Sequence, residues 1–245
     1  MHEVKAERQL YNQSVTNARA EIAEQPVPVN PAPGMSMDLQ NVHYTFDYSQ
    51  AVSIPHHVCQ VGPLYFATPR KVQVFGVAME GIRKQFNFLI DEDSTPWENG
   101  TKVKGAIGVI SMLHYCFENF GLGEKECHLH CDNASGENKN KFMLAYLMWR
   151  ILSGKHSKIN LHMQVPYHGK SLVDAEFAYI KKLYRRAEVD SLEQLASVVR
   201  KSARSNEVIV WWGWQRMARL EDIYFRVLRF FQGHQEIQTP CLPGR

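Results

Sequence analysis

Residues 126–150 read ECHLHCDNASGENKNKFMLAYLMWR, a pattern that predicts a strand, a polar turn and a helix in immediate succession. The first residues alternate too evenly for a helix, so His128, His130 and Asp132 would share one face of a strand. Residues 133–139 are small and polar, and the apolar residues that follow recur at helical spacing. Asp132 therefore stands where a strand opens into a helix, the edge at which α/β sheets bind ligands. The alternative is that Asp132 only caps the turn.

Other segments predict the remaining elements of an α/β domain. We expect strands at residues 41–48, 71–79, 84–90, 158–165 and 208–212, and helices at residues 1–24, 106–117, 172–186, 191–201 and 221–231. The short turn at residues 80–83 makes the second and third strands a hairpin, and residues 49–70 are expected to form a long irregular insertion.

The order of these segments predicts how the chain divides. Residues 1–24 form an N-terminal helix, and the prolines of residues 25–40 make a stiff linker. Within residues 41–190, three antiparallel strands followed by strand–helix units give a mixed five-stranded sheet flanked by helices. That is the strand order of a ribonuclease H-like domain, in which the first and fourth strands are parallel neighbours. Residues 191–245 are expected to be a mostly helical C-terminal appendage.

Composition narrows the class of protein. With 44% hydrophobic and 22% charged residues, the 245-residue chain is expected to fold around one main core. A formal net charge of +3 is too small to indicate nucleic-acid binding without local clustering. Five irregularly placed cysteines suit a reducing compartment rather than a disulfide framework. No signal peptide or span of about 20 apolar residues is evident, so we expect an intracellular protein of the nucleus or cytoplasm, without a membrane partner.

Acidic residues at strand ends have a defined chemical use. In the predicted strand order Asp47 comes close to Asp132, and a carboxylate of the last domain helix approaches both. Carboxylate oxygens suit Mg²⁺ or Mn²⁺, and paired ions of this kind promote phosphodiester chemistry. Three crowded carboxylates would repel one another without a cation. The sequence therefore predicts a divalent-metal site at this sheet edge.

Five segments together carry a family resemblance. They are HYTFDYSQ, GPLYFATPRKVQVFGVAMEG, GVISMLHYCFENFGLGEK, HLHCDNASGENKNKFMLAYLMWRI and FAYIKKLYRRAEVDSL. They resemble a family of transposon-derived eukaryotic proteins with a ribonuclease H-like domain of the integrase and transposase type. The resemblance covers about residues 5–200, and its most specific part is the DN-x-x-G-x-NKN stretch.

The resemblance implies a site, residue by residue. Asp47, Asp132 and Asp174 would be the catalytic, metal-binding triad, with Mg²⁺ or Mn²⁺ as the cofactor. The loop beside them would consist of Asn133, Gly136, Asn138 and Lys139, of which Lys139 could neutralise phosphate. The implied function is cleavage and strand transfer on transposon ends or target DNA, in a chain that could act as a homo-oligomer.

The chain departs from the family pattern at three places. Glu137 stands where the family usually has Gln. The family's Gly-His-Thr is replaced by PYHG at residues 166–169, with one extra residue before Asp174. The sequence beyond about Ser202 follows the family only loosely. Glu176 is therefore the alternative third ligand, and the alternative function is a decayed, non-catalytic DNA-binding or assembly module.

Two further clusters have competing interpretations. Lys181, Lys182, Arg185 and Arg186 could follow a DNA backbone or form a solvated helix face. The cluster of Cys127, His128, His130 and Cys131 suggests zinc, but consecutive strand residues point to opposite faces, so at most two could bind one ion. Trp211, Trp212 and Trp214 could stack on bases, although interior aromatics are commoner.

Overall fold

The computed structural model describes residues 2–59, 62, 66–92, 105–164 and 171–211. Its helices are α1 (His2–Ala23), α2 (Ala106–Asn119), α3 (Lys141–Leu152), α4 (Leu172–Tyr184) and α5 (Leu192–Ser202). Its strands are β1 (Val42–Tyr48), β2 (Val52–Ile54), β3 (Arg70–Met79), β4 (Lys84–Asp91), β5 (Glu126–Cys131), β6 (Lys158–Met163) and β7 (Asn206–Val210). The expected helix at 221–231 and the loop at 166–169 lie outside the described residues.

The strands form one mixed sheet in the order β6-β5-β1-β3-β4-β7, with β2 pairing beside β3. β1, β3 and β4 are antiparallel neighbours, as the predicted hairpin requires. β5 runs parallel to β1, and β6 runs parallel to β5. The prediction that the first and fourth long strands are parallel neighbours is therefore confirmed.

The predicted number of five strands is wrong, because the sheet has seven. β2 lies inside the insertion at 49–70 and pairs antiparallel with β3. β7 was expected as a strand of the appendage, but it extends the sheet by pairing parallel with β4. Both pairings depend on contacts between distant parts of the chain, which local sequence patterns do not reveal. The appendage predicted to begin at residue 191 thus contributes α5 and β7 to the main domain.

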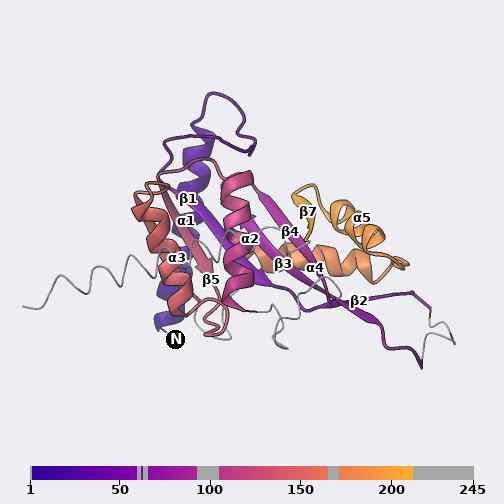
Figure 1. The fold of residues 1–245 in the computed structure, drawn as a ribbon. Helices are drawn as coiled ribbons and strands as arrows, with labels where there is room; N and C mark the ends of the chain where they lie inside the picture. The colour runs from indigo at the N-terminus through magenta and orange to yellow at the C-terminus, as the bar shows by residue number, and fades with distance from the viewer. Residues whose placement is uncertain (1, 60–61, 63–65, 93–104, 165–170, 212–245) are drawn as a thin grey trace, which may run out of the picture.

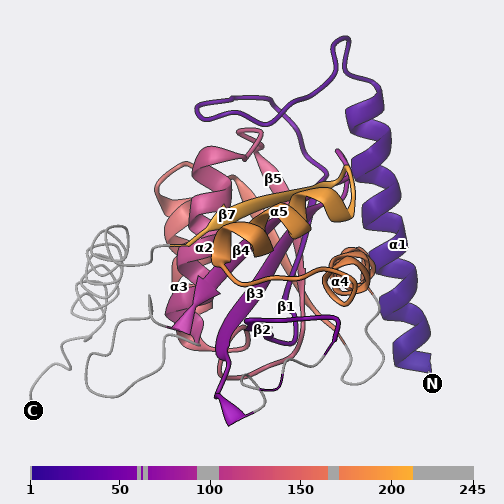
Figure 2. The same ribbon diagram turned by 90° about the vertical axis from the view of Figure 1, so that its right-hand side faces the viewer.

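The sheet separates two layers of helices (Figure 1). α2 and α3 cover one face, where Tyr44, Phe46 and Leu129 are fully buried in the larger core cluster. α4 and α5 cover the other face over a second cluster that includes Val74 and Leu195. Figure 2 shows the α4–α5 layer and the α2–α3 layer on opposite sides of the strands.

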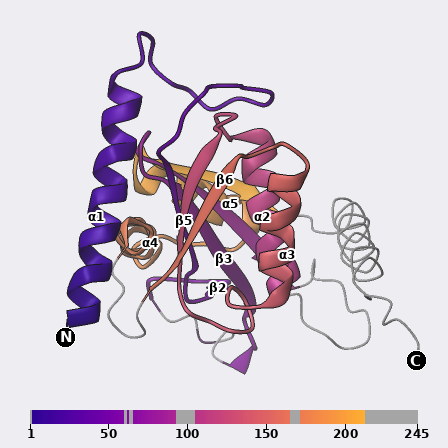
Figure 3. The ribbon, with the colours of Figure 1, turned by 90° about the vertical axis from the view of Figure 1, so that its left-hand side faces the viewer.

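α1 packs beside α4 against the same face of the sheet, as Figure 3 shows from the other side. Its buried residues Tyr11, Ser14, Val15 and Ala18 follow helical spacing and make the stripe that meets the sheet. Gly81, in the β3–β4 turn, allows this approach, since a Cβ there would lie 3.1 Å from the Ala18 carbonyl oxygen. α1, which the sequence predicts to be separated from the domain by a linker, thus packs against the sheet of that domain.

Among the described residues, no helix is long and apolar enough to span a bilayer.

Candidate functional site

The two parallel strands β1 and β5 bring Asp47 and Asp132 together. In their register Thr45 is opposite His130, so two further residues along each strand place Asp47 opposite Asp132. Both side chains are partly buried at the carboxyl ends of their strands. Successive side chains of a strand point to opposite faces of the sheet. Neighbouring residues such as Phe46 point into the α2–α3 core, so the two aspartates lie on the opposite face. The predicted neighbourhood of these two carboxylates is therefore confirmed.

The polar loop after β5 holds the Asp132 carboxylate in place. Asn138 is 2% exposed, and its side-chain N–H donates to Oδ1 of Asp132. The Ala134 amide donates to the same oxygen over 3.3 Å. The Ala134 carbonyl in turn accepts the amides of Asn138 at 2.8 Å and Lys139 at 2.9 Å. The DN-x-x-G-x-N stretch thus folds back on itself and orients the acid that begins it.

The same loop starts the next helix. The side chain of Asn140 caps α3 by accepting the amides of Phe142 at 3.1 Å and Met143 at 3.0 Å. This cap satisfies two of the amides that a helix start leaves without partners. Lys139, between the loop's anchor and the cap, has an exposed side chain. It follows Asn138, whose side chain holds the Asp132 carboxylate.

α4 supplies the third carboxylate, and a glycine lets it approach. Gly76 of β3 is the cross-strand partner of Asp47, and Phe177 of α4 packs directly over it. A Cβ on Gly76 would lie 2.8 Å from Cζ of Phe177, closer than real Cβ atoms come. Phe177 is one turn after Asp174 on the helix. The start of α4 is therefore held close to the end of β1.

The helical stripe predicted for α4 is confirmed, with Val173, Phe177, Ile180 and Tyr184 all buried. This register leaves Asp174 exposed in the first turn, where its Oδ2 accepts the amide of Ser171 at 3.0 Å. The hydroxyl of Ser171 donates to the same oxygen over 3.1 Å. Asp174 consequently also caps its own helix.

The pKa of Asp47 depends on its burial and on the charged groups near it. Burial and the negative charge of Asp132 raise the pKa of Asp47 to about 7, with smaller contributions from Asp174 and Glu137. The amide of Tyr48, which donates to Oδ1 of Asp47 over 2.7 Å, acts in the opposite direction. Burial and neighbouring negative charge both disfavour the ionised form of this carboxyl group.

Glu176, the alternative third ligand, and Glu137 lie near different carboxyl groups. Glu176 acts on a different carboxyl, since its charge contributes to the raised pKa of Glu80. The structure thus groups Asp174, rather than Glu176, with Asp47. Glu137 was noted only as a departure from the family pattern, yet it adds a fourth negative charge here. Its position in the loop that follows Asp132 was visible in the sequence, but the direction in which the loop brings its charge was not.

The four carboxyl groups are not clustered tightly. Within the described residues, only Glu124, Cys127 and His156 bring three ligating atoms within 4.8 Å of one another, so the three aspartates are spaced more widely. Those three buried residues could by position hold an ion. However, Nδ1 of His156 accepts from Arg150 over 3.2 Å, which places the ring proton on Nε2, 3.6 Å from Glu124. A metal would need the lone pair of that nitrogen.

Glu124 is instead the centre of a hydrogen-bonded network. Burial alone would raise its pKa, but the nearby His156 and the hydrogen bond from Tyr44 outweigh burial and lower it. The Tyr44 hydroxyl donates over 2.6 Å and the Leu122 amide over 2.9 Å. Buried polar groups with this many partners stabilise one arrangement of a core. This group therefore joins β1 to the α2–β5 connection.

The suggested Cys/His zinc cluster is split by the sheet, as predicted. Cys127 and Cys131 are buried in the core beneath α2 and α3. His130 lies on the opposite face, where it bonds His43 at 2.7 Å and stacks on His162 with ring centroids 4.5 Å apart. No single ion could bind both sets.

The basic residues and tryptophans also have definite positions. Four basic residues lie at the C-terminal end of α4 and just beyond it: Lys181, which is partly exposed, and Lys182, Arg185 and Arg186, which are exposed. Lys181 comes about two helical turns after Asp174 and Arg185 about three, so both lie on the same face of the helix as Asp174. Lys181 is about 10 Å from Asp174 along the helix axis. Trp211 is buried against Phe88, with centroids 5.3 Å apart. Trp212 and Trp214 lie outside the described residues.

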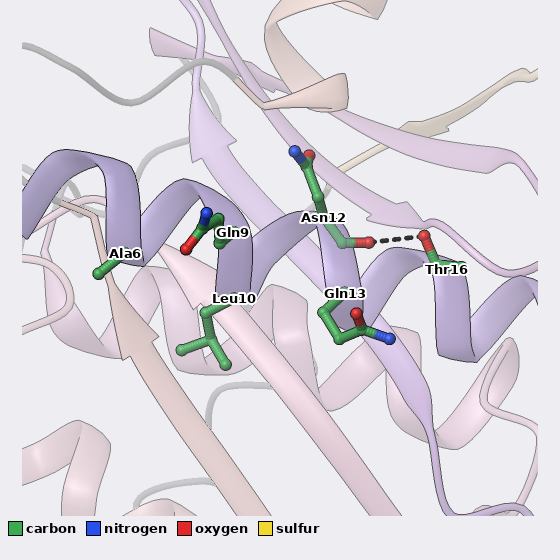
Figure 4. A pocket seen from close by; sticks show the side chains of 6 residues that line it. All are labelled: Ala6, Gln9, Leu10, Asn12, Gln13 and Thr16. Atoms are coloured by element: carbon green, nitrogen blue, oxygen red, sulfur yellow. Dashed lines mark hydrogen bonds between the residues drawn. The ribbon is translucent and has the colours of Figure 1, made fainter.

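A surface hollow on α1 lacks the chemistry of the strand-end site (Figure 4). Its lining residues are exposed on the helix and carry no ionisable side chain: Ala6, Gln9, Leu10, Asn12, Gln13 and Thr16. The hydroxyl of Thr16 there donates to the Asn12 carbonyl over 2.8 Å. The candidate functional site is thus the group of carboxylates at the ends of β1 and β5.

Comparison with known proteins gives a family without an assigned activity. A model described as "Domain of unknown function (DUF7869)" matches residues 67–236, more than half of the chain. The matched residues contain Asp132 and Asp174, whereas Asp47 and α1 precede them. No curated protein and no solved structure matches the chain. The chain belongs to the DUF7869 family.

Proposed function

We propose that this protein is a transposase- or integrase-like nuclease, which uses divalent metal to cleave phosphodiesters and transfer DNA strands. The observation that carries the proposal is the convergence of three sequence-distant aspartates. Asp47 and Asp132 end neighbouring parallel strands. Asp174 lies close enough for its charge to act on Asp47.

A ribonuclease H-like identity for the domain is part of this proposal. It is supported by the order β4-β3-β1-β5-β6, in which three antiparallel strands are followed by two parallel ones. This is the arrangement that the family resemblance implies for transposon-derived proteins. In it, β7 is an addition beside β4.

The donor set fits Mg²⁺ or Mn²⁺. Asp47, Asp132 and Asp174 would hold the metal through hard carboxylate oxygens. Such an ion would activate the attacking oxygen and stabilise the leaving oxygen of a phosphodiester. A pKa of about 7 means that Asp47 is only partly ionised at neutral pH in the metal-free protein. Asn138 would keep Asp132 oriented, through its bond to Oδ1.

DNA is the proposed partner, either transposon ends or a target site. Lys139 is an exposed residue of the loop that holds Asp132, and Lys181 and Arg185 continue along the face of α4 that carries Asp174. Lys182 and Arg186 widen the same basic end. Cations in this arrangement can neutralise successive phosphates of a DNA backbone. The proposal also implies a nuclear protein that could act as a homo-oligomer.

A non-catalytic DNA-binding or assembly module is the second candidate. Two observations favour it: the three aspartates are spaced more widely than a compact metal cluster, and Asp174 has a capping role of its own. Under this alternative, Asp174 would serve α4 and bind no metal. The basic end of the helix would remain the DNA-binding surface.

A cleavage assay on duplex and single-stranded DNA with Mn²⁺ separates the two candidates. The nuclease requires that Asp174→Ala abolish cleavage and that Glu176→Ala, two residues away, leave most of it. If Glu176→Ala is the inactive variant, the third ligand is Glu176. If wild-type protein cleaves neither substrate yet still binds DNA through the basic residues, the non-catalytic module is the correct function.

A further inference from the structure

Tyr11 of α1 connects two elements of the candidate site. The residue is 9% exposed, and its hydroxyl donates to Oε1 of Glu80 over 2.7 Å. The same hydroxyl accepts the backbone N–H of Leu172 over 3.1 Å. Leu172 is the first residue of α4, two positions before Asp174. One hydroxyl therefore ties α1 to the start of the helix that carries the third carboxylate.

The other end of this connection reaches β1. Oε1 of Glu80 also accepts the hydroxyl of Thr45 over 2.9 Å. Thr45 precedes Asp47 by two residues, so both side chains point to the same face of β1. Glu80 is 2% exposed, and the shared oxygen is a fixed point between strand and helix. Hydrogen bonds therefore connect the start of α4, through Tyr11 and Glu80, to β1, the strand that carries Asp47.

The ring of Tyr11 is itself held by the sheet. It packs edge-on against His43 and His130, with centroid distances of 5.3 Å and 5.1 Å. Its hydroxyl therefore cannot swing away without losing two aromatic contacts. The pKa of the phenol is raised, first by burial and then by the charge of Glu80, so it remains a neutral donor at physiological pH.

We propose that Tyr11 is a positioning residue for the metal-binding carboxylates, fixing the first turn of α4 so that Asp174 stays beside Asp47. α1 lies outside the residues that match the family model, so this helix completes a site whose other parts are mostly inside them. The effect on metal affinity rests on the proposed function. The placement of α4 by Tyr11 does not.

Backbone hydrogen exchange measures the placement directly. The first amides of a helix have no acceptor within the helix, so they normally exchange quickly. The bond to Tyr11 predicts that the Leu172 amide exchanges slowly in the wild-type protein. Tyr11→Phe removes only the hydroxyl, and exchange at Leu172 should then become fast while the rest of α4 stays protected.

Mn²⁺ binding, followed by electron paramagnetic resonance, measures the consequence for the site. We expect Tyr11→Phe to weaken Mn²⁺ binding about 10-fold, the scale seen when groups that orient metal ligands are lost. Tyr44→Phe is the matched control, because it also removes a buried hydroxyl that bonds a glutamate, but on the opposite face of the sheet. This control should lower thermal stability without changing Mn²⁺ affinity or Leu172 exchange.

Each outcome decides a separate claim. Fast exchange of Leu172 in the wild-type protein would overturn the placement of α4 by Tyr11, and this holds even if Tyr11→Phe does not fold. Unchanged Mn²⁺ affinity in a folded Tyr11→Phe variant would overturn the positioning role. If wild-type protein binds no Mn²⁺, the proposed nuclease fails, while the Leu172 exchange still confirms or rejects the placement.

Discussion

At the scale of single residues, the site depends on which side chains share a face of the sheet. Alternation alone predicts that His128, His130 and Asp132 point one way, and the structure places His130 and Asp132 with Asp47 on the α4 face. What the sequence could not reveal is the bond between Asn138 and Asp132, or the charge of Glu137 on Asp47. Both depend on how the loop folds back, which composition does not determine.

The pKa of Asp47 should depend on its neighbour across the strands. In metal-free protein, Asp132→Asn removes the largest charge acting on Asp47, so the pKa should fall from about 7 but stay above normal because burial remains. Carboxyl ¹³C NMR titration measures this. Because the folded-state pKa of Asp47 exceeds that of the unfolded chain, the stabilising contribution of this one group should be lost as pH rises from about 4 to 7. In Asp132→Asn, less of this contribution should be lost. An unchanged Asp47 pKa in the variant would mean that the two residues are not neighbours.

His43 should give the opposite dependence on pH. Burial and the charge of His130 lower its pKa to about 2, so the folded protein keeps it neutral. The unfolded chain binds a proton below about pH 6.5. The free energy of unfolding should therefore fall by about 1.4 kcal/mol per pH unit on acidification through this one group. Urea unfolding of His43→Leu between pH 6 and 4 should show a shallower slope than wild type. An equal slope in His43→Leu and in the wild-type protein would contradict the prediction.

At the scale of elements, hydrophobic periodicity was sufficient for most helices and strands. The apolar stripe of α4 and the hairpin of β3 and β4 are where the sequence predicts them. β2 was not predicted, because a strand of three residues is too short to show periodicity. The packing of α1 was not predicted either, because a thin apolar stripe does not show which element it packs against. The close approach of α4 to β3 depends on one missing side chain, at Gly76.

Gly76→Ala should displace α4 from the sheet. The new methyl group would meet Phe177 at 2.8 Å and Nε2 of Gln85 at 2.9 Å, so overpacking should destabilise the protein by about 1–3 kcal/mol. Chemical denaturation measures the loss, and Phe177→Leu in the same chain should recover part of it. Gly62→Ala, where nothing lies within 4 Å, is the control and should change little. Equal stability of the two alanine variants would show that Phe177 does not fix α4 at this strand.

At the scale of the whole molecule, the order of the five long strands was predictable and the limits of the domain were not. Strand order follows from the alternation of hairpin and strand–helix units along the chain. β7 lies beyond the predicted boundary at residue 190, yet it pairs with β4, more than a hundred residues earlier in the chain. The same long-range packing brings α1 to the site through Tyr11. A chain divided by sequence signals alone would therefore lose parts of the structure that hold the carboxylates together.

Calorimetric titration of Mn²⁺ into the metal-free protein tests the metal site most directly. Wild-type protein should bind Mn²⁺, and Asp132→Asn should abolish or greatly weaken binding, since it removes a proposed ligand from the carboxylate group. Asp190→Asn makes the same chemical change at an exposed residue that pairs with His57, and it should bind as wild type does. Equal binding by Asp132→Asn and wild type, or no binding by wild type at millimolar Mn²⁺, would contradict a metal site at the ends of β1 and β5.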